Sequence, residues 1–247
     1  MFNQKLKIVD ILDWDTNFFG LKIAQFNDNK LNQENLKYAF KFCKQNKVRL
    51  LQFKCEASDV ETIHLAEANG FHLADIRVKL KREIEPTNNQ NKSLSENYKF
   101  RIASSDDIYI LKQIVNNLYV HSRYYNDNNF SKSAVSNFYK IWIENSVRGK
   151  FDDIAYIVCN ESLPVGFCTL KFTTNNCAKI GLFGVDKNQL GKGIGYNLLK
   201  NVLIFLEERK INNIRVTTQG TNYYAQRLYQ KVGFKIEKFE IFYHCWL

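Results

Sequence analysis

Long hydrophobic runs are absent from this sequence of 247 residues. No uninterrupted apolar stretch approaches the roughly 20 residues that a membrane-spanning helix needs, so we expect no membrane span. The first residues, MFNQKLKIVDILDWD, also lack the basic-then-apolar arrangement of a secretory signal peptide. We therefore expect a soluble protein of the cytoplasm.

The cysteine pattern gives no support to a metal site or to a disulfide framework. The six cysteines are scattered along the chain, and none of them forms a CxxC pair. We therefore expect no bound metal. Free cysteines behave as small hydrophobic residues, so most of these thiols are expected to be reduced and to lie in the core.

Sequence patterns of nucleic-acid binding are also missing, although the formal net charge is +10. The chain has no arginine-rich tract, zinc finger or RNP-like strand, and we therefore expect no nucleic-acid partner. Two explanations of the charge remain open. It is either an ordinary basic surface or a source of attraction for phosphate-bearing small molecules.

Proline is scarce, and one of the two prolines lies in the most linker-like part of the chain. Residues 85–97, EPTNNQNKSLSEN, are polar and are predicted to connect a domain at 1–84 to a domain at 98–247. In the second domain, hydrophobic periodicity predicts helices and strands that alternate around a mixed sheet. The helices are expected at 104–119, 134–149 and 221–234 and from the glycine loop to about 210, and the strands at 153–160, 164–173, 177–185, 213–219 and 236–247.

A short similarity links the two domains. It joins IHLAEANGFHLADIRVKLK at 63–81 to QRLYQKVGFKIEKFEIFY at 226–243. When the two stretches are aligned on Gly70 and Gly233, both predict a helix, a glycine after its last turn, a phenylalanine and an alternating strand.

Glycine is concentrated at one place, in NQLGKGIGYNLL at 188–199. The first turn of a helix leaves backbone N–H groups without internal partners, and these groups and the helix dipole favour an anion. The missing side chains at Gly191, Gly193 and Gly195 would let a pyrophosphate approach the backbone. The spacing fits neither a P-loop nor the GxGxxG dinucleotide loop. A tight turn without a ligand is the remaining alternative.

These motifs resemble the GNAT superfamily of N-acyltransferases, whose R/Q-x-x-G-x-G/A signature wraps the pyrophosphate of acyl-coenzyme A. LGKGIG at 190–195 has the glycine spacing, with Leu190 where Arg or Gln is usual. The second signature, N-x-x-A-x-x-L-Y-x-x-x-G-F, follows at 222–234. The resemblance implies an α/β (α+β) GNAT fold over 98–247, with a mixed, mostly antiparallel sheet flanked by helices.

Further stretches, among them WDTNFFGLKIAQF at 14–26 and HSRYYNDNNF at 121–130, resemble bacterial N-acyltransferases that act on dTDP-fucosamine and related sugar nucleotides. In these enzymes an incomplete GNAT-like domain, here 1–84, precedes the catalytic domain. The first domain has Ala66 where the second has Tyr229. The resemblance implies transfer of an acetyl or longer short-chain acyl group from acyl-CoA to a dTDP-linked amino-deoxy sugar, for surface polysaccharide (lipopolysaccharide) synthesis.

The resemblance also implies the residues that hold acyl-CoA. The strand before the loop would splay and pair with the pantetheine arm, and a backbone N–H around 183–185 would stabilise the oxyanion. Tyr229 is the candidate general acid toward the coenzyme A sulfur, because a phenol with a pKa near ~10 keeps its proton at neutral pH. The predicted cofactor-binding residues are Phe183, Gly184, Val185, Leu190, Gly191, Lys192, Gly193, Ile194, Gly195, Asn222, Ala225 and Tyr229.

The predicted acceptor site is SRYYND at 122–127, in a loop between the first two helices of the second domain. Arginine suits bidentate phosphate binding, and tyrosine can stack on a base or sugar. No general base is assigned, and His121, His244, Asp127 and a water chain remain open. The predicted substrate-binding residues are Arg123, Tyr124 and Tyr125.

Two other functions remain open. One is a GNAT enzyme that acetylates a protein N-terminus or another amine, and the other is a non-catalytic acyl-CoA-binding module. The acyl chain, the nucleotide carrier, the sugar carbon that bears the amine and the formation of a homodimer are also left open.

Overall fold

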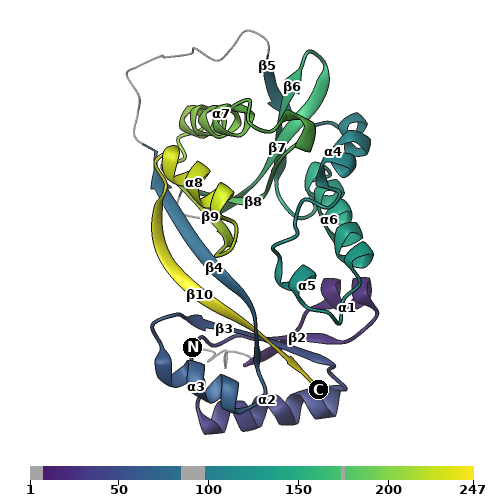
Figure 1. Cartoon of the computed structure of the whole chain (residues 1–247), viewed down its shortest axis with the longest axis vertical. Coiled ribbons are helices and arrows are strands. Elements are labelled where there is room, and N and C mark those ends of the chain that lie inside the picture. Colours follow the sequence, from purple (N-terminus) through teal and green to yellow (C-terminus); the bar gives the residue numbers. More distant parts are fainter. Residues whose placement is uncertain (1–7, 85–97, 174–175) are drawn as a thin grey trace, which may run out of the picture.

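The computed structural model describes residues 8–84, 98–173 and 176–247, so the predicted linker at 85–97 lies outside the described residues. The strands form one mixed sheet in the order β1-β2-β3-β10-β4-β9-β8-β7-β6-β5 (Figure 1). Only β2–β3 and β8–β9 are parallel pairs within this sheet. The strands are β1 (Val9–Ile11), β2 (Ile23–Phe26), β3 (Leu50–Glu56), β4 (His72–Glu83), β5 (Tyr98–Ile102), β6 (Ile154–Asn160), β7 (Leu163–Thr173), β8 (Cys177–Val185), β9 (Asn213–Gln219) and β10 (Lys235–Trp246).

Most helices begin at side chains that accept hydrogen bonds from otherwise unpaired N–H groups. Ser131 caps α6 in this way, Asn222 caps α8, and Asn32 forms a capping box on α2. Within the described part of the chain, no helix is both long and apolar enough to cross a membrane. The helices are α1 (Asp13–Phe19), α2 (Gln33–Asn46), α3 (Val60–Ala68), α4 (Ile108–Val115), α5 (Arg123–Asn126), α6 (Lys132–Val147), α7 (Ile194–Glu208) and α8 (Tyr223–Lys231).

Two local expectations differ from the structure. The helix expected at 104–119 begins with a 3-10 turn and ends at Val115, before Asn117 takes a left-handed conformation with φ 60°. Residues 123–126, expected in a loop, form the short helix α5, and the Ser122 side chain accepts a hydrogen bond from the Tyr125 N–H at its start. This turn fixes which of its side chains face inward.

The similarity between the two domains marks two equivalent units. Helix α3 leads through Gly70 (φ 80°) and the buried Phe71 into β4, and helix α8 leads through Gly233 (φ 93°) and the buried Phe234 into β10. The predicted helix, glycine, phenylalanine and strand are therefore confirmed in both. Each glycine adopts a left-handed conformation that other residues rarely take.

The two equivalent strands are exchanged between the halves of the sheet. Strand β4 follows β3 and α3 in the chain, yet it pairs with β9; strand β10 follows β9 and α8, yet it pairs with β3. The two strands also pair with each other, from Lys81–Lys235 to His72–His244. In Figure 1 they run as one long ribbon pair between the upper and lower parts of the molecule. Residues Arg77–Glu83 of β4, which come from the N-terminal half of the chain, thus pair inside the C-terminal half of the sheet.

Buried side chains form three clusters around this shared sheet. One lies between α7, α8 and strands β4 and β6–β9, and a second lies between α2, α3 and strands β1–β3. The third joins α1 to α4, α5 and α6. In it, the Trp14 ring of α1 lies 4.2 Å from the Phe138 ring of α6, measured between centroids. The N-terminal helix therefore packs on the C-terminal half. All six cysteines are buried and unpaired.

Candidate functional site

A gap between two parallel strands forms the central cavity of the molecule. β8 and β9 pair from Cys177–Asn213 to Ile180–Val216 and then diverge. Past this point β8 pairs only with β7, while the end of β9 pairs with β4. The opening contains a cavity of about 290 Å³. Its lining includes Asp75 and Arg77 of β4, Arg123 of α5, Phe183 of β8, Thr217 and Gln219 of β9, and Asn222, Ala225 and Tyr229 of α8.

Tyr229 reaches this cavity from α8. Its side chain is 3% exposed, and its ring lies 6.1 Å from the Phe183 ring and 5.5 Å from the Phe234 ring, measured between centroids. Burial raises the pKa of the Tyr229 phenol well above its usual value of 10. The phenol therefore keeps its proton throughout the neutral range, as a proton donor must.

The glycine loop leads into α7 without a side-chain cap on the first turn of this helix. Gly191 and Gly193 adopt φ values of 78° and 76°, a region that disfavours residues with side chains. Gly193 occupies the N-cap position, where it offers no side chain to the first turn, and the first ladder bond runs from the Asn197 N–H to the Gly193 carbonyl. The N–H groups at the start of α7 are thus left for an external acceptor.

The third glycine lies in close contact with neighbouring elements. A Cβ atom on Gly195 would lie 3.2 Å from Leu228 Cδ2 of α8 and 3.6 Å from Val185 Cγ2 of β8. Gly195 therefore allows α7 to pack closely on α8 and on the end of β8. Beside it, Leu190 is 64% exposed, and the Lys192 ammonium donates to the Gln189 side-chain oxygen at 2.9 Å.

The end of β8 is held by a bulge opposite β7. The pairing slips between Cys168 and Leu170, and the buried Leu182 N–H donates to the Thr169 hydroxyl at 2.7 Å. Phe183 lines the central cavity, and its carbonyl accepts a hydrogen bond from the Tyr119 hydroxyl at 3.2 Å. A Cβ on Gly184 would collide with Leu118 Cδ2 at 2.4 Å, so this glycine faces the chain after α4 and does not line the cavity.

The three predicted acceptor residues lie in different surroundings in the structure. Arg123 lines the central cavity, and its Nε atom is buried without a hydrogen-bond partner. Tyr124 is fully buried, and its hydroxyl donates to Asp15 and accepts from the Gln52 amide at 2.8 Å. Tyr125 also does not line the cavity, and the Lys132 ammonium lies 4.3 Å from its ring centroid. Of the three predicted residues, only Arg123 lines the central cavity, next to Ser122 of the same motif, because α5 turns the two tyrosines away.

The three side chains considered as bases do not line the central cavity. His244 Nδ1 lies 2.6 Å from Asp127 Oδ2, which also accepts from the Trp246 indole at 2.9 Å. Burial lowers the pKa of His244, although its hydrogen bond to Asp127 acts in the opposite direction. This hydrogen-bonded pair connects the end of β10 to the chain after α5. His121 Nδ1 lies 3.2 Å from the Thr221 hydroxyl.

Asp75 is the titratable residue that the sequence did not reveal. Its side chain lines the central cavity from β4 and is 8% exposed. Burial raises the pKa of Asp75 from 3.8 to about 7, and the nearby Arg77 and Arg123 guanidinium groups limit the rise. The strand exchange alone brings it to this place, since β4 belongs to the N-terminal half.

Two further cavities adjoin the central one. A cavity of about 550 Å³, lined mainly by lysine and arginine, shares Arg77, Ile180 and Thr217 with it. Another, of about 320 Å³, shares Arg77, Arg123 and Trp142. Arg77 therefore lies where all three meet. Over residues 8–84, 98–173 and 176–247, no group of three His, Cys, Asp or Glu side chains could hold a metal ion.

Comparison with known proteins identifies relatives of this fold and sequence. Residues 116–234 match the model of the Acetyltransferase (GNAT) family. The dTDP-fucosamine acetyltransferase of Escherichia coli O6:H1 (strain CFT073) is 29% identical over 188 residues, which are 76% of this chain and 77% of that protein. The spore coat polysaccharide biosynthesis protein SpsD of Bacillus subtilis (strain 168) is 25% identical over 134 residues, which are 54% of this chain and 46% of SpsD.

Solved structures share the architecture at lower identity. A GCN5-related N-acetyltransferase from Sphaerobacter thermophilus has a TM-score of 0.66 and 13% identity, and the match covers 96% of this chain and 75% of that one. A tandem GNAT protein from the clavulanic acid biosynthesis pathway has a TM-score of 0.59 and 12% identity, over 92% and 76% of the two chains. The predicted fold class, a mixed sheet flanked by helices, is confirmed.

Replacing Tyr124 with phenylalanine tests the structural role of its hydroxyl. Tyr124→Phe removes the donor to Asp15 and the acceptor for Gln52, both part of a buried network. We expect the free energy of unfolding, measured in urea, to fall by about 1–3 kcal/mol. Tyr109→Phe is the matched control, since Tyr109 is 70% exposed and should change stability by less than about 0.5 kcal/mol. Equal stability of the two variants would contradict the role.

Proposed function

We propose that this acyl-CoA-dependent N-acyltransferase acts on the amino group of a dTDP-linked amino-deoxy sugar. The product would serve the synthesis of a surface polysaccharide, as the name of the Bacillus subtilis relative suggests. The observation that carries the proposal is the central cavity, where the Tyr229 phenol and the Arg77 and Arg123 guanidinium groups line one space. An anionic sugar derivative suits such a lining.

In this proposal the acyl carrier enters from the glycine loop. The free amides at 190–195 and the N-terminal end of α7 would hold its diphosphate. Its pantetheine arm would follow the gap between β8 and β9, beside Phe183, Asn222 and Ala225. Asn222 also accepts a hydrogen bond from the Ala225 N–H at 3.2 Å, which fixes the start of α8 next to this path. The carrier would thus be oriented before the acceptor arrives, which supplies rate by proximity.

The transfer requires two proton movements in this cavity. The neutral amine attacks the thioester carbonyl carbon, the carbon–sulfur bond breaks, and the sulfur leaves as a thiolate. We assign Tyr229 as the acid that protonates the sulfur and Asp75 as the base that takes the proton from the amine. A carboxyl with a pKa of about 7 is suited to this exchange near neutral pH. Backbone N–H groups near Phe183 are the proposed donors to the oxyanion.

An acyltransferase that modifies a protein N-terminus is the alternative function. An uncharged peptide would leave the cationic lining around Arg77 without a counterpart, which favours the sugar nucleotide. A module that only binds acyl-CoA would have no use for a protonated Tyr229 next to the gap between the strands.

A transfer assay across acceptor classes tests the proposed function. The purified chain is mixed with acetyl-CoA and with a dTDP-linked amino sugar, a UDP-linked amino sugar, the free amino sugar or a peptide amine. We expect kcat/KM to be at least tenfold higher for the dTDP-linked sugar than for the free amino sugar, because one charge-assisted contact contributes about that factor. Measurement of released thiol follows the reaction. A peptide that is acylated faster than either nucleotide sugar would favour the alternative.

Removing the Tyr229 hydroxyl tests the assignment of this residue as the general acid. Tyr229→Phe should lower kcat at least tenfold, since the thiolate then leaves without a positioned proton donor. The affinity for coenzyme A, measured by calorimetry, should stay within about twofold because the aromatic contacts remain. Tyr109→Phe on α4 is the control for loss of a tyrosine hydroxyl outside the central cavity. An unaltered kcat in Tyr229→Phe would remove the assignment.

The pH dependence of Asp75→Asn tests the base. Ionised Asp75 is the active form, so wild-type kcat/KM for the acceptor should rise to a plateau above about pH 7. Asp75→Asn should lose that rise and should be at least tenfold slower at pH 8. A rise with the same midpoint in the variant would contradict the assignment.

The pH dependence of stability gives a second test of the raised pKa of the Asp75 carboxyl. Its folded pKa is raised, so below about pH 4 it is neutral in both the folded and the unfolded chain. As the pH rises to 7, the unfolded chain ionises first and wild type loses stability. The free energy of unfolding of Asp75→Asn, measured in urea and compared with that of wild type, should therefore increase between pH 4 and pH 8.

A further inference from the structure

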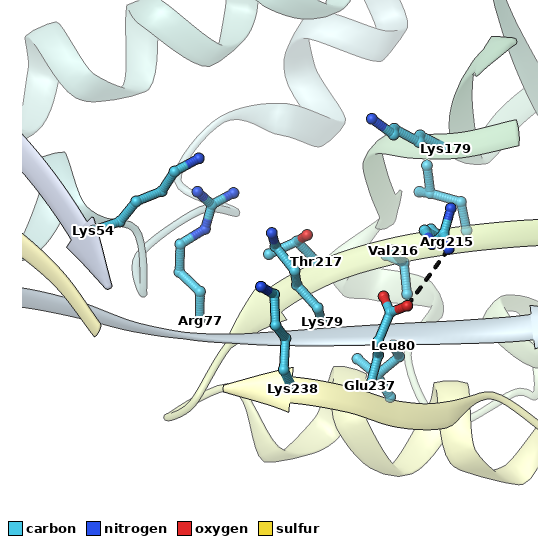
Figure 2. A pocket seen from close by; sticks show the side chains of 11 residues that line it. Lys54, Arg77, Lys79, Leu80, Lys179, Arg215, Val216, Thr217, Glu237 and Lys238 are labelled. Atoms are coloured by element: carbon cyan, nitrogen blue, oxygen red, sulfur yellow. Dashed lines mark hydrogen bonds and ion pairs between the residues drawn. The ribbon is translucent and has the colours of Figure 1, made fainter. Parts of the chain in front are cut away.

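A cationic cavity lies on the same face of the sheet as Asp75 and beside the central cavity. It has a volume of about 550 Å³. Strands β3, β4, β8, β9 and β10 all contribute to it, so both halves of the chain build it. Figure 2 shows the nitrogen ends of Lys54, Arg77, Lys79 and Lys238 on one side of the strands, with Lys179 and Arg215 across from them. These six cationic side chains line the cavity: Lys54, Arg77, Lys79, Lys179, Arg215 and Lys238.

Carboxylates balance only half of these cations. The Lys79 ammonium lies 2.7 Å from Glu240 Oε1, and the Lys238 ammonium lies 2.6 Å from Glu56 Oε1. Arg215 lies 3.5 Å from Glu237 Oε1, the one carboxylate in the lining. These ion pairs connect the strands. The other three cations of the lining take no part in them.

The remaining cations form no close ion pair. Among the residues that the structure describes, no ion pair within 4 Å involves Lys54, Arg77 or Lys179. Arg77 lies 5.6 Å from the Phe242 ring centroid, so its guanidinium stacks on an apolar face. Burial lowers the pKa of Lys54, and the nearby Arg77 and Lys79 lower it further against the effect of Glu240. Like charges crowded around a partly buried space favour a bound anion.

We propose that the cationic cavity binds the diphosphate of the nucleotide-linked acceptor, an inference that rests on the proposed function. Arg77, Ile180, Val216 and Thr217 line both cavities, so a ligand can pass from one to the other without leaving the protein surface. With its diphosphate among the cations, the acceptor presents its sugar toward Asp75 and Tyr229. Arg77 provides the fork geometry that phosphate oxygens accept, and Lys54 and Lys179 add charge.

The diphosphate of the acyl carrier is a separate group. Its proposed site is the amide-lined start of α7, and no residue of 190–195 lines the cationic cavity. The two diphosphates therefore enter at two places, and the amine and thioester meet at the gap between β8 and β9. This arrangement gives the N-terminal half a direct part in binding, since Lys54, Arg77 and Lys79 all come from it.

Calorimetric titration with dTDP tests the cationic cavity without any acyl transfer. Arg77→Gln and Lys179→Gln each remove one cation without breaking an ion pair. Each should weaken dTDP binding at least tenfold, whereas Arg77→Lys should weaken it less than Arg77→Gln does. Lys41→Gln, an exposed lysine on α2, makes the same charge change elsewhere and should leave the affinity within twofold. Coenzyme A affinity should be unchanged in all variants, and dTDP and coenzyme A should bind together. Circular dichroism checks the folding of each variant. If Arg77→Gln fails to fold, Lys179→Gln still tests the site, because Lys179 is exposed.

Three outcomes would overturn the inference. They are wild-type protein that does not bind dTDP, dTDP affinity unchanged in Lys179→Gln and Arg77→Gln, and displacement of dTDP by coenzyme A. The last would assign the cations to the acyl carrier. If nucleotide sugars are acylated while these variants bind dTDP normally, the proposed function stands and only this site fails. If dTDP binding depends on the cations but no nucleotide sugar is acylated, the proposed acceptor fails and the anion site stands.

Discussion

The exchange of β4 and β10 is the constraint on which the rest of the structure depends. Each strand satisfies its backbone hydrogen bonds with the opposite half of the sheet, so neither half has a complete sheet of its own. Trp14 adds to the contact between the two halves by packing among aromatic side chains of α6. The predicted division at 85–97 describes the order of the chain, but both halves build the central cavity.

Charge is distributed along this sheet in a way that separates two kinds of anion site. At the start of α7, the groups available to an anion are backbone amides, exposed because Gly191 and Gly193 turn the chain without side chains. On the sheet face, the groups are lysine and arginine side chains from five strands. In the proposed arrangement, the first site would bind a diphosphate through dipoles and geometry, and the second would attract one through net charge. This difference would allow two polyanionic substrates to bind together without competing.

Burial sets the protonation of the two proposed catalytic groups in the direction that transfer requires. The Tyr229 phenol and the Asp75 carboxyl both have raised pKa values, because removal from water disfavours their charged forms. Asp127 shows the opposite result, since hydrogen bonds from His244, Asn129 and Trp246 outweigh its burial and lower its pKa. A carboxylate satisfied in this way is a structural anchor, whereas Asp75 remains free to exchange a proton.

The sequence by itself determined the local features whose cause is local. The glycine loop before α7, the cap of α8 at Asn222, and the strand that follows Gly233 depend on neighbouring residues, and each could be predicted from spacing and residue type. Only the tertiary structure decided that Tyr124 is buried, that Gly195 serves helix packing, and that Asp75 and Arg77 enter the central cavity. The physical reason is that strand pairing is non-local. Nothing in the alternation of β4 indicates that its partners are β9 and β10, at least 130 residues further along the chain.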